Sequence, residues 1–144
     1  MKKVCHVIVI ALVICLTIVP IKVSAVIEKP VTDEIEPQFI TINTIYALLQ
    51  IDERNGIATC VGEVQARDMV PVEVVVQLQQ LKNGVWDTLY TWSDTGTLYA
   101  TKAGSYAIAR GYTYRTKTIA FVHDTDGNII ESGSATHQVD YPKK

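Results

Sequence analysis

Segments in which apolar and polar residues alternate follow one another through residues 38–141, separated by short turns, and this pattern limits the fold more than any other feature. Alternation with a period of two is typical of strands with one buried face, and no segment shows a convincing helical period. We therefore expect an all-β protein with strands at 40–51, 57–66, 72–81, 85–92, 97–101, 105–109, 112–123 and 129–139.

The turns between these segments indicate how the strands are connected. Asn83-Gly84 is the strongest hairpin signal, because both residues tolerate the positive φ of a type I′ turn. Asp126-Gly127 marks the turn of the last hairpin. The number and spacing of the segments predict a single two-sheet sandwich of about seven antiparallel strands, of the immunoglobulin-like or fibronectin-III-like kind.

The first 25 residues have the three-part organisation of a secretory signal peptide. Lys2 and Lys3 form a positive start, residues 4–20 are almost wholly apolar, and Val23-Ser24-Ala25 places small residues where a signal peptidase reads. Cleavage between Ala25 and Val26 is therefore expected, and the mature protein would be secreted or associated with the cell surface.

Two other interpretations of this segment stay open. The apolar run is at the short edge of what spans a bilayer, so an uncleaved signal would anchor the protein to a membrane. Lipid attachment at Cys15 is the second, although Ile14 stands where a lipidation motif needs a small residue.

The mature chain divides into an acidic leader, a domain and a short tail. Residues 26–37 hold four acids and two prolines without a usable period, which predicts disorder; 38–141 form the sandwich and 142–144 the tail. Three of the 13 Lys and Arg residues and none of the 15 acids precede Val26, leaving a formal net charge of −5. A weakly acidic domain has no electrostatic reason to bind nucleic acid.

Cys60 is the only cysteine of the mature chain, so no intrachain disulfide is expected. It shares a strand face with Ala58, Gly62 and Val64, which predicts a buried, reduced thiol. The segment 112–123 has no cysteine to face it, but Tyr112 or Tyr114 is placed to serve as the corner tyrosine of an immunoglobulin-like sandwich.

Several motifs, taken in order, resemble a widespread group of small exported proteins of Gram-positive bacteria. They are the segment 40–51, Ala58-Thr59-Cys60-Val61-Gly62, Val76-Gln77-Leu78-Gln79-Gln80, Gly84-Val85-Trp86, Tyr90-Thr91-Trp92-Ser93, Gly111-Tyr112-Thr113-Tyr114-Arg115 and Glu131-Ser132. The resemblance implies a signal peptide followed by one immunoglobulin-like β-sandwich. It implies no activity and no site residue.

The chain offers no catalytic constellation, and we expect no catalytic residue, cofactor or metal. It has no Ser-His-Asp set and no phosphate-binding glycine loop that we can nominate. His123 and His137 are expected to lie roughly 23 Å apart along the last hairpin, which is too far to share a metal. The segment Asp124 to Asn128 resembles a fragment of a calcium loop, but a tight turn accounts for its composition better.

Aromatic and amide side chains around the Asn83-Gly84 hairpin form the candidate binding site. Pairing across this turn puts Leu81 opposite Trp86, Gln77 opposite Tyr90 and Val75 opposite Trp92. The candidate ligand-binding residues, all expected on one outward face, are Trp86, Tyr90, Trp92, Gln77 and Gln79. Ring faces with amides suit sugars or peptides. The alternative is structural: sandwiches often bury a tryptophan, and a bulge would reverse the faces.

These features favour an exported, non-enzymatic binding module of unassigned ligand. A cell-wall glycan and a surface protein are the partners considered, and no nucleic acid is expected. A secreted effector or antimicrobial protein is the first alternative, and a secreted hydrolase the second.

Overall fold

The computed structural model describes residues 39–144, so the expected signal peptide, its cleavage site and the acidic leader lie outside the described residues. The described chain forms seven strands: β1 (Ile42–Asp52), β2 (Ile57–Ala66), β3 (Pro71–Lys82), β4 (Val85–Thr97), β5 (Tyr99–Ala107), β6 (Tyr112–His123) and β7 (Ile129–Tyr141). None of its elements is a helix, and so no helix there could cross a membrane.

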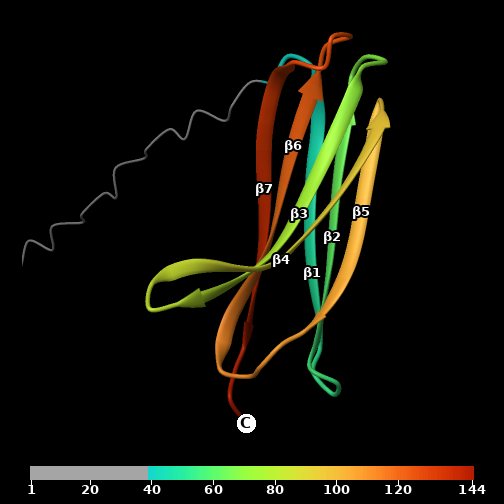
Figure 1. The fold of residues 1–144 in the computed structure, drawn as a ribbon. Helices are drawn as coiled ribbons and strands as arrows, with labels where there is room; N and C mark the ends of the chain where they lie inside the picture. Colours follow the sequence, from blue (N-terminus) through green and yellow to red (C-terminus); the bar gives the residue numbers. More distant parts are fainter. Residues whose placement is uncertain (1–38) are drawn as a thin grey trace, which may run out of the picture. The chain divides into compact units, whose positions relative to one another are not determined.

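The strands form two antiparallel sheets that pack face to face (Figure 1). One sheet has the order β1-β2-β5 and the other the order β4-β3-β6-β7. This confirms the predicted all-β sandwich of seven antiparallel strands. Within residues 39–144 the single cysteine, Cys60, is free, as expected.

The expected strand bounds hold for β2 and β6 and fail in the middle of the chain. Instead of separate strands at 97–101 and 105–109, β4 continues to Thr97 and a single β5 follows. The turn between them is made by Leu98, which has a φ of 67°. The sequence Lys102-Ala103-Gly104 suggests the end of a strand, but Gly104 lies within β5 and pairs with Cys60 of β2.

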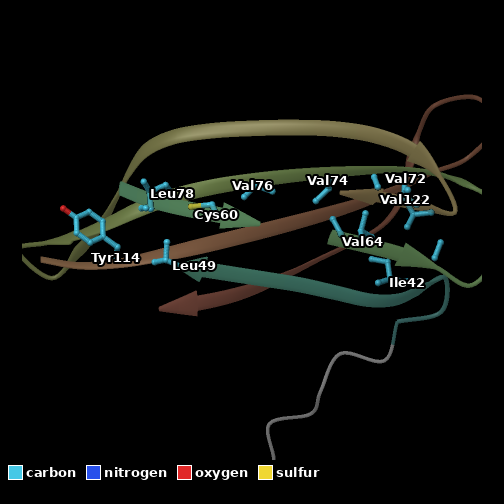
Figure 2. Packing of buried hydrophobic residues seen from close by; sticks show 14 of the residues in the cluster. Ile42, Leu49, Cys60, Val64, Val72, Val74, Val76, Leu78, Tyr114 and Val122 are labelled. Carbon is cyan, nitrogen blue, oxygen red and sulfur yellow. The ribbon is translucent and has the colours of Figure 1, made fainter. Parts of the chain in front are cut away.

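The core lies between the sheets, where alternate residues of the central strands are buried (Figure 2). From one sheet, Ala58, Cys60 and Val64 of β2 are fully buried, as predicted for that face. From the other sheet, the inner residues of β3 and β6 face them; these include Val72, Val74, Val76, Leu78, Tyr114, Ala120 and Val122. Burial raises the pKa of the Cys60 thiol, and the Thr116 hydroxyl partly offsets this.

Tyr114, rather than Tyr112, is the corner tyrosine. Its ring is buried, and its hydroxyl donates to the Ala109 carbonyl at 2.7 Å. The same oxygen accepts the Ala109 N–H at 3.2 Å and the Gln80 side-chain amide at 3.3 Å. These bonds fix the connection from β5 to β6 against the end of β6.

The free edge of β1 is covered by inward-facing side chains of β7. Glu131 Oε1 accepts the Ile40 N–H at 2.7 Å, and Glu131 Oε2 accepts those of Thr41 and Ile42, both at 2.8 Å. Further along, His137 Nδ1 accepts the Leu49 N–H at 2.9 Å. Backbone groups that would otherwise offer a pairing edge are thus satisfied by side chains.

We expect Glu131→Gln to destabilise the fold by about 1–2 kcal/mol at pH 7, because an amide turns an NH₂ group toward N–H donors. Burial raises the pKa of Glu131, but the three backbone N–H groups outweigh it and hold the pKa below its usual value. A folded-state pKa below the unfolded one means that this stabilisation is present at neutral pH and is lost as the pH falls through the folded pKa.

Urea unfolding of the wild-type and Glu131→Gln proteins at several pH values measures this effect. The difference should be largest at pH 7 and should shrink well below pH 4.5. Glu63→Gln, on the outer face of β2, is the matched control and should change little at either pH. A difference that does not vary with pH would contradict the assignment.

The hairpin between β3 and β4 turns at Asn83-Gly84 as predicted, with φ values of 53° and 79°. Nothing lies within 4 Å of the position of a Cβ at Gly84, so a side chain there meets only backbone strain. We expect Gly84→Val to cost about 1 kcal/mol or more, and Gly84→Asn to cost less because asparagine tolerates this conformation. Equal unfolding midpoints for the two variants would contradict this account.

Candidate functional site

A bulge in β4 separates the residues that the sequence placed on one face. Gln79 pairs with Thr88, but the preceding residue of β3, Leu78, pairs with Tyr90, so Leu89 is an extra residue in β4. An extra residue reverses which side chains face outward beyond it. The prediction that Trp86 and Trp92 share a face is therefore wrong.

The candidate ligand-binding residues therefore lie on opposite faces of the sheet. Trp86 pairs with Leu81 on the outer side, together with Gln77 and Gln79. Beyond the bulge, Tyr90 and Trp92 pair with Leu78 and Val76, whose side chains are buried between the sheets. Gln77 pairs with Thr91 rather than Tyr90, and Val75 with Ser93 rather than Trp92.

Tyr90 and Trp92 instead form an aromatic contact with Tyr106 where β4 lies beside β5. The rings of Tyr90 and Trp92 are 4.8 Å apart between centroids, and those of Tyr90 and Tyr106 are 5.7 Å apart. The Trp92 ring lies directly on Gly104, where any Cβ would collide with it. Trp92 is partly buried against the core, so this contact closes the sandwich at the β4–β5 side.

The outer half of the site is a hydrogen-bonded cluster on β3, β4 and β6, which we call the outer-face cluster: Trp86, Arg115, Gln79, Gln77 and Thr88. The Arg115 guanidinium carbon lies 4.1 Å from the centroid of the Trp86 ring, and Arg115 Nε donates to Gln79 Oε1 at 2.7 Å. The Gln79 amide nitrogen then donates to Gln77 Oε1 at 3.1 Å and to Thr88 Oγ1 at 3.0 Å.

The strand register brings this cluster together. Arg115 pairs directly with Gln79 across β3 and β6, and Gln79 pairs with Thr88 across β3 and β4. Although Gln79 lies on the outer face, it is only 7 % exposed. Both groups of its amide are occupied by neighbouring side chains, so Arg115 is held by its hydrogen bond to Gln79 and by its position over the Trp86 ring.

The positive charge of the cluster has no acidic partner in the described part of the chain. The one ion pair within 4.0 Å among residues 39–144 joins His123 to Glu73 at 3.4 Å. Lys117 follows Arg115 on the same outer face of β6 and likewise lacks a carboxylate within that distance. Cations that stay unpaired in the protein are free to bind an anionic ligand.

A shallow depression of about 230 Å³ adjoins this cationic stretch on the outer face. It is lined by Lys117, Ile119, Ser132, Gly133 and Ser134 of β6 and β7. Another shallow depression, of about 260 Å³, lies near the end of the chain beside Gly111 to Thr113 and Asp140 to Lys143. Both are open hollows, so a ligand on the outer face would lie across the surface rather than in a pocket.

The histidines and the acidic turn have structural roles. His123 pairs with Glu73 and its Nδ1 is 3.2 Å from the Gly127 carbonyl, while His137 bonds to β1. Asp124 Oδ1 accepts the N–H groups of Asp126 and Asn128, and its Oδ2 accepts the Asn128 side chain, as in a turn. No three His, Cys, Asp or Glu residues of the described chain gather as metal ligands.

Sequence reasoning missed Arg115, which holds the cluster together. It lies 36 residues from Gln79, and only the pairing of β6 with β3 brings the two together. The alternating pattern of 112–123 places Arg115 on the outer side, but no local signal shows which strand lies beside it.

Comparison of the sequence with models of protein families and with curated proteins finds no match. The family resemblance described above therefore remains an expectation from its motifs.

Proposed function

We propose that this protein is an exported, non-enzymatic binding module with an immunoglobulin-like or fibronectin-III-like sandwich, which binds its ligand through the outer-face cluster. The observation that carries the proposal is the fixed arrangement of Trp86, Arg115 and Gln79 on the outer, partly exposed face of the β4-β3-β6-β7 sheet. An aromatic ring and polar groups whose orientations are already fixed lose little conformational entropy on binding.

The signal-like N-terminus and the resemblance to small exported Gram-positive proteins support a role at the cell surface or in the medium. The strand order β1-β2-β5 and β4-β3-β6-β7 and the corner tyrosine support the immunoglobulin-like assignment. The partner we propose is the cell envelope, whose glycans present the hydroxyl groups and flat sugar faces that such a cluster suits.

Sedimentation with isolated cell walls of a Gram-positive bacterium tests this proposal. The wild-type protein should sediment with the walls, and Trp86→Ala should stay in the supernatant while keeping its unfolding midpoint within a few degrees. Tyr99→Ala, an exposed tyrosine on the other sheet, is the control and should sediment as the wild type does. Wild-type protein that stays in solution, or sedimentation that is the same for all three proteins, would overturn the proposal.

A further inference from the structure

We propose that the outer-face cluster recognises a carboxylate on a polysaccharide, with Arg115 as the residue that binds the carboxylate. This rests on the proposed binding function and names the chemistry of its ligand.

The Arg115 guanidinium has a geometry that suits a carboxylate. Its Nε donates to Gln79 and its carbon lies over the Trp86 ring, so the side chain is held at two points. Within residues 39–144 its two Nη groups make no hydrogen bond. A guanidinium held in this way presents parallel N–H donors, which match the two oxygens of a carboxylate.

The charge around Arg115 also favours an anionic ligand. In the described residues no carboxylate lies within 4.0 Å of Arg115 or of Lys117, which follows it on the same face. The nearest acid along the outer face of β7, Asp140, accepts a hydrogen bond from Thr113 instead. The site therefore holds local positive charge on a weakly acidic protein, so attraction to an anion would come from the cluster and not from the net charge.

The surroundings of Arg115 suit a glycan better than a peptide. Many peptide ligands bind by adding a strand to a free sheet edge, where backbone hydrogen bonds hold them. The cluster instead presents side chains on the outer face of β3, β6 and the edge strand β4, and Lys117, which follows Arg115 on that face, lines an open hollow together with Ser132 and Ser134. Its other neighbours are amides and hydroxyls, such as Gln77 and Thr88, which suit the hydroxyl groups of a sugar chain.

Calorimetric titration with polygalacturonate oligomers, and with the same oligomers as methyl esters, tests the inference. The acid form should bind and the ester, which has lost its charge, should bind about tenfold more weakly or worse. Arg115→Gln should lose a similar factor, and Arg115→Lys should not restore binding because a lysine lacks the planar pair of donors. The control is Arg54→Gln, which removes the same charge from the exposed β1–β2 turn and should leave the affinity within about twofold.

Three further outcomes would overturn the inference. They are equal binding of ester and acid, an equal loss in Arg54→Gln, and equally tight binding of a polyglutamate peptide or of a glycerol-phosphate polymer. The wall-sedimentation assay separates this inference from the proposed function. Wild-type protein that sediments with walls but does not bind polygalacturonate would refute only the carboxylate inference, whereas protein that binds neither would refute both.

Discussion

Gly62→Ala is expected to lower the free energy of unfolding by about 3 kcal/mol, a large effect for a single added methyl group. Gly62 is buried in the middle of β2, where it pairs with Ala47 of β1 on one side and with Lys102 of β5 on the other. A Cβ there would overlap Val76 Cγ2 and would lie 2.6 Å from Thr118 Oγ1. Both contacts come from β-branched side chains of the opposite sheet, which have little freedom to move.

Urea denaturation of Gly62→Ala measures this cost, and Ala103→Val is a suitable control. Ala103 lies on the outer face of the adjacent strand β5 and is exposed, so its added methyl groups meet solvent and should change stability by less than about 0.5 kcal/mol. If the cost comes from overlap, adding Val76→Ala to Gly62→Ala should cost less than the sum of the two single changes. Strict additivity would contradict the packing account.

How far the sequence predicts this fold depends on whether a signal is local. The bounds of β2 and β6 follow from alternation because each strand has one face that is regularly buried. The Asn83-Gly84 turn follows from backbone preferences of two adjacent residues. His137 opposite Thr116 follows from counting along the last hairpin, even though a bulge near His123 shifts the register at its other end.

What could not be predicted depends on contacts between distant segments. The bulge at Leu89 has no special residue to mark it, since Thr88, Leu89 and Tyr90 all suit a strand. The bulge places the Trp92 ring between the sheets, on a glycine of β5 that the sequence shows as a break. The cluster around Arg115 and the covering of β1 by Glu131 likewise exist only once the sheets are assembled.

Because of the bulge, we expect removal of the two tryptophan side chains to have different effects on the stability of the protein. We expect Trp92→Ala to destabilise the protein by about 3 kcal/mol, because the ring fills the space above Gly104 and packs against the core. We expect Trp86→Ala to cost only about 1 kcal/mol, since that ring lies on the outer face and loses chiefly its contact with Arg115. Denaturant unfolding of the two variants gives both values.

Acrylamide quenching of single-tryptophan proteins checks the same assignment without removing a large side chain. Trp86→Phe leaves Trp92 as the only tryptophan of the described chain, and its fluorescence should be the better protected of the two. Trp92→Phe leaves Trp86, which should be quenched more strongly. Equal quenching and equal destabilisation would contradict this assignment. They would mean that both rings lie on one face, as they would if β3 and β4 paired without a bulge. Because Trp92 supports the fold, a loss of binding in Trp92→Ala would not identify it as a ligand residue, whereas a loss in the stable Trp86→Ala protein would.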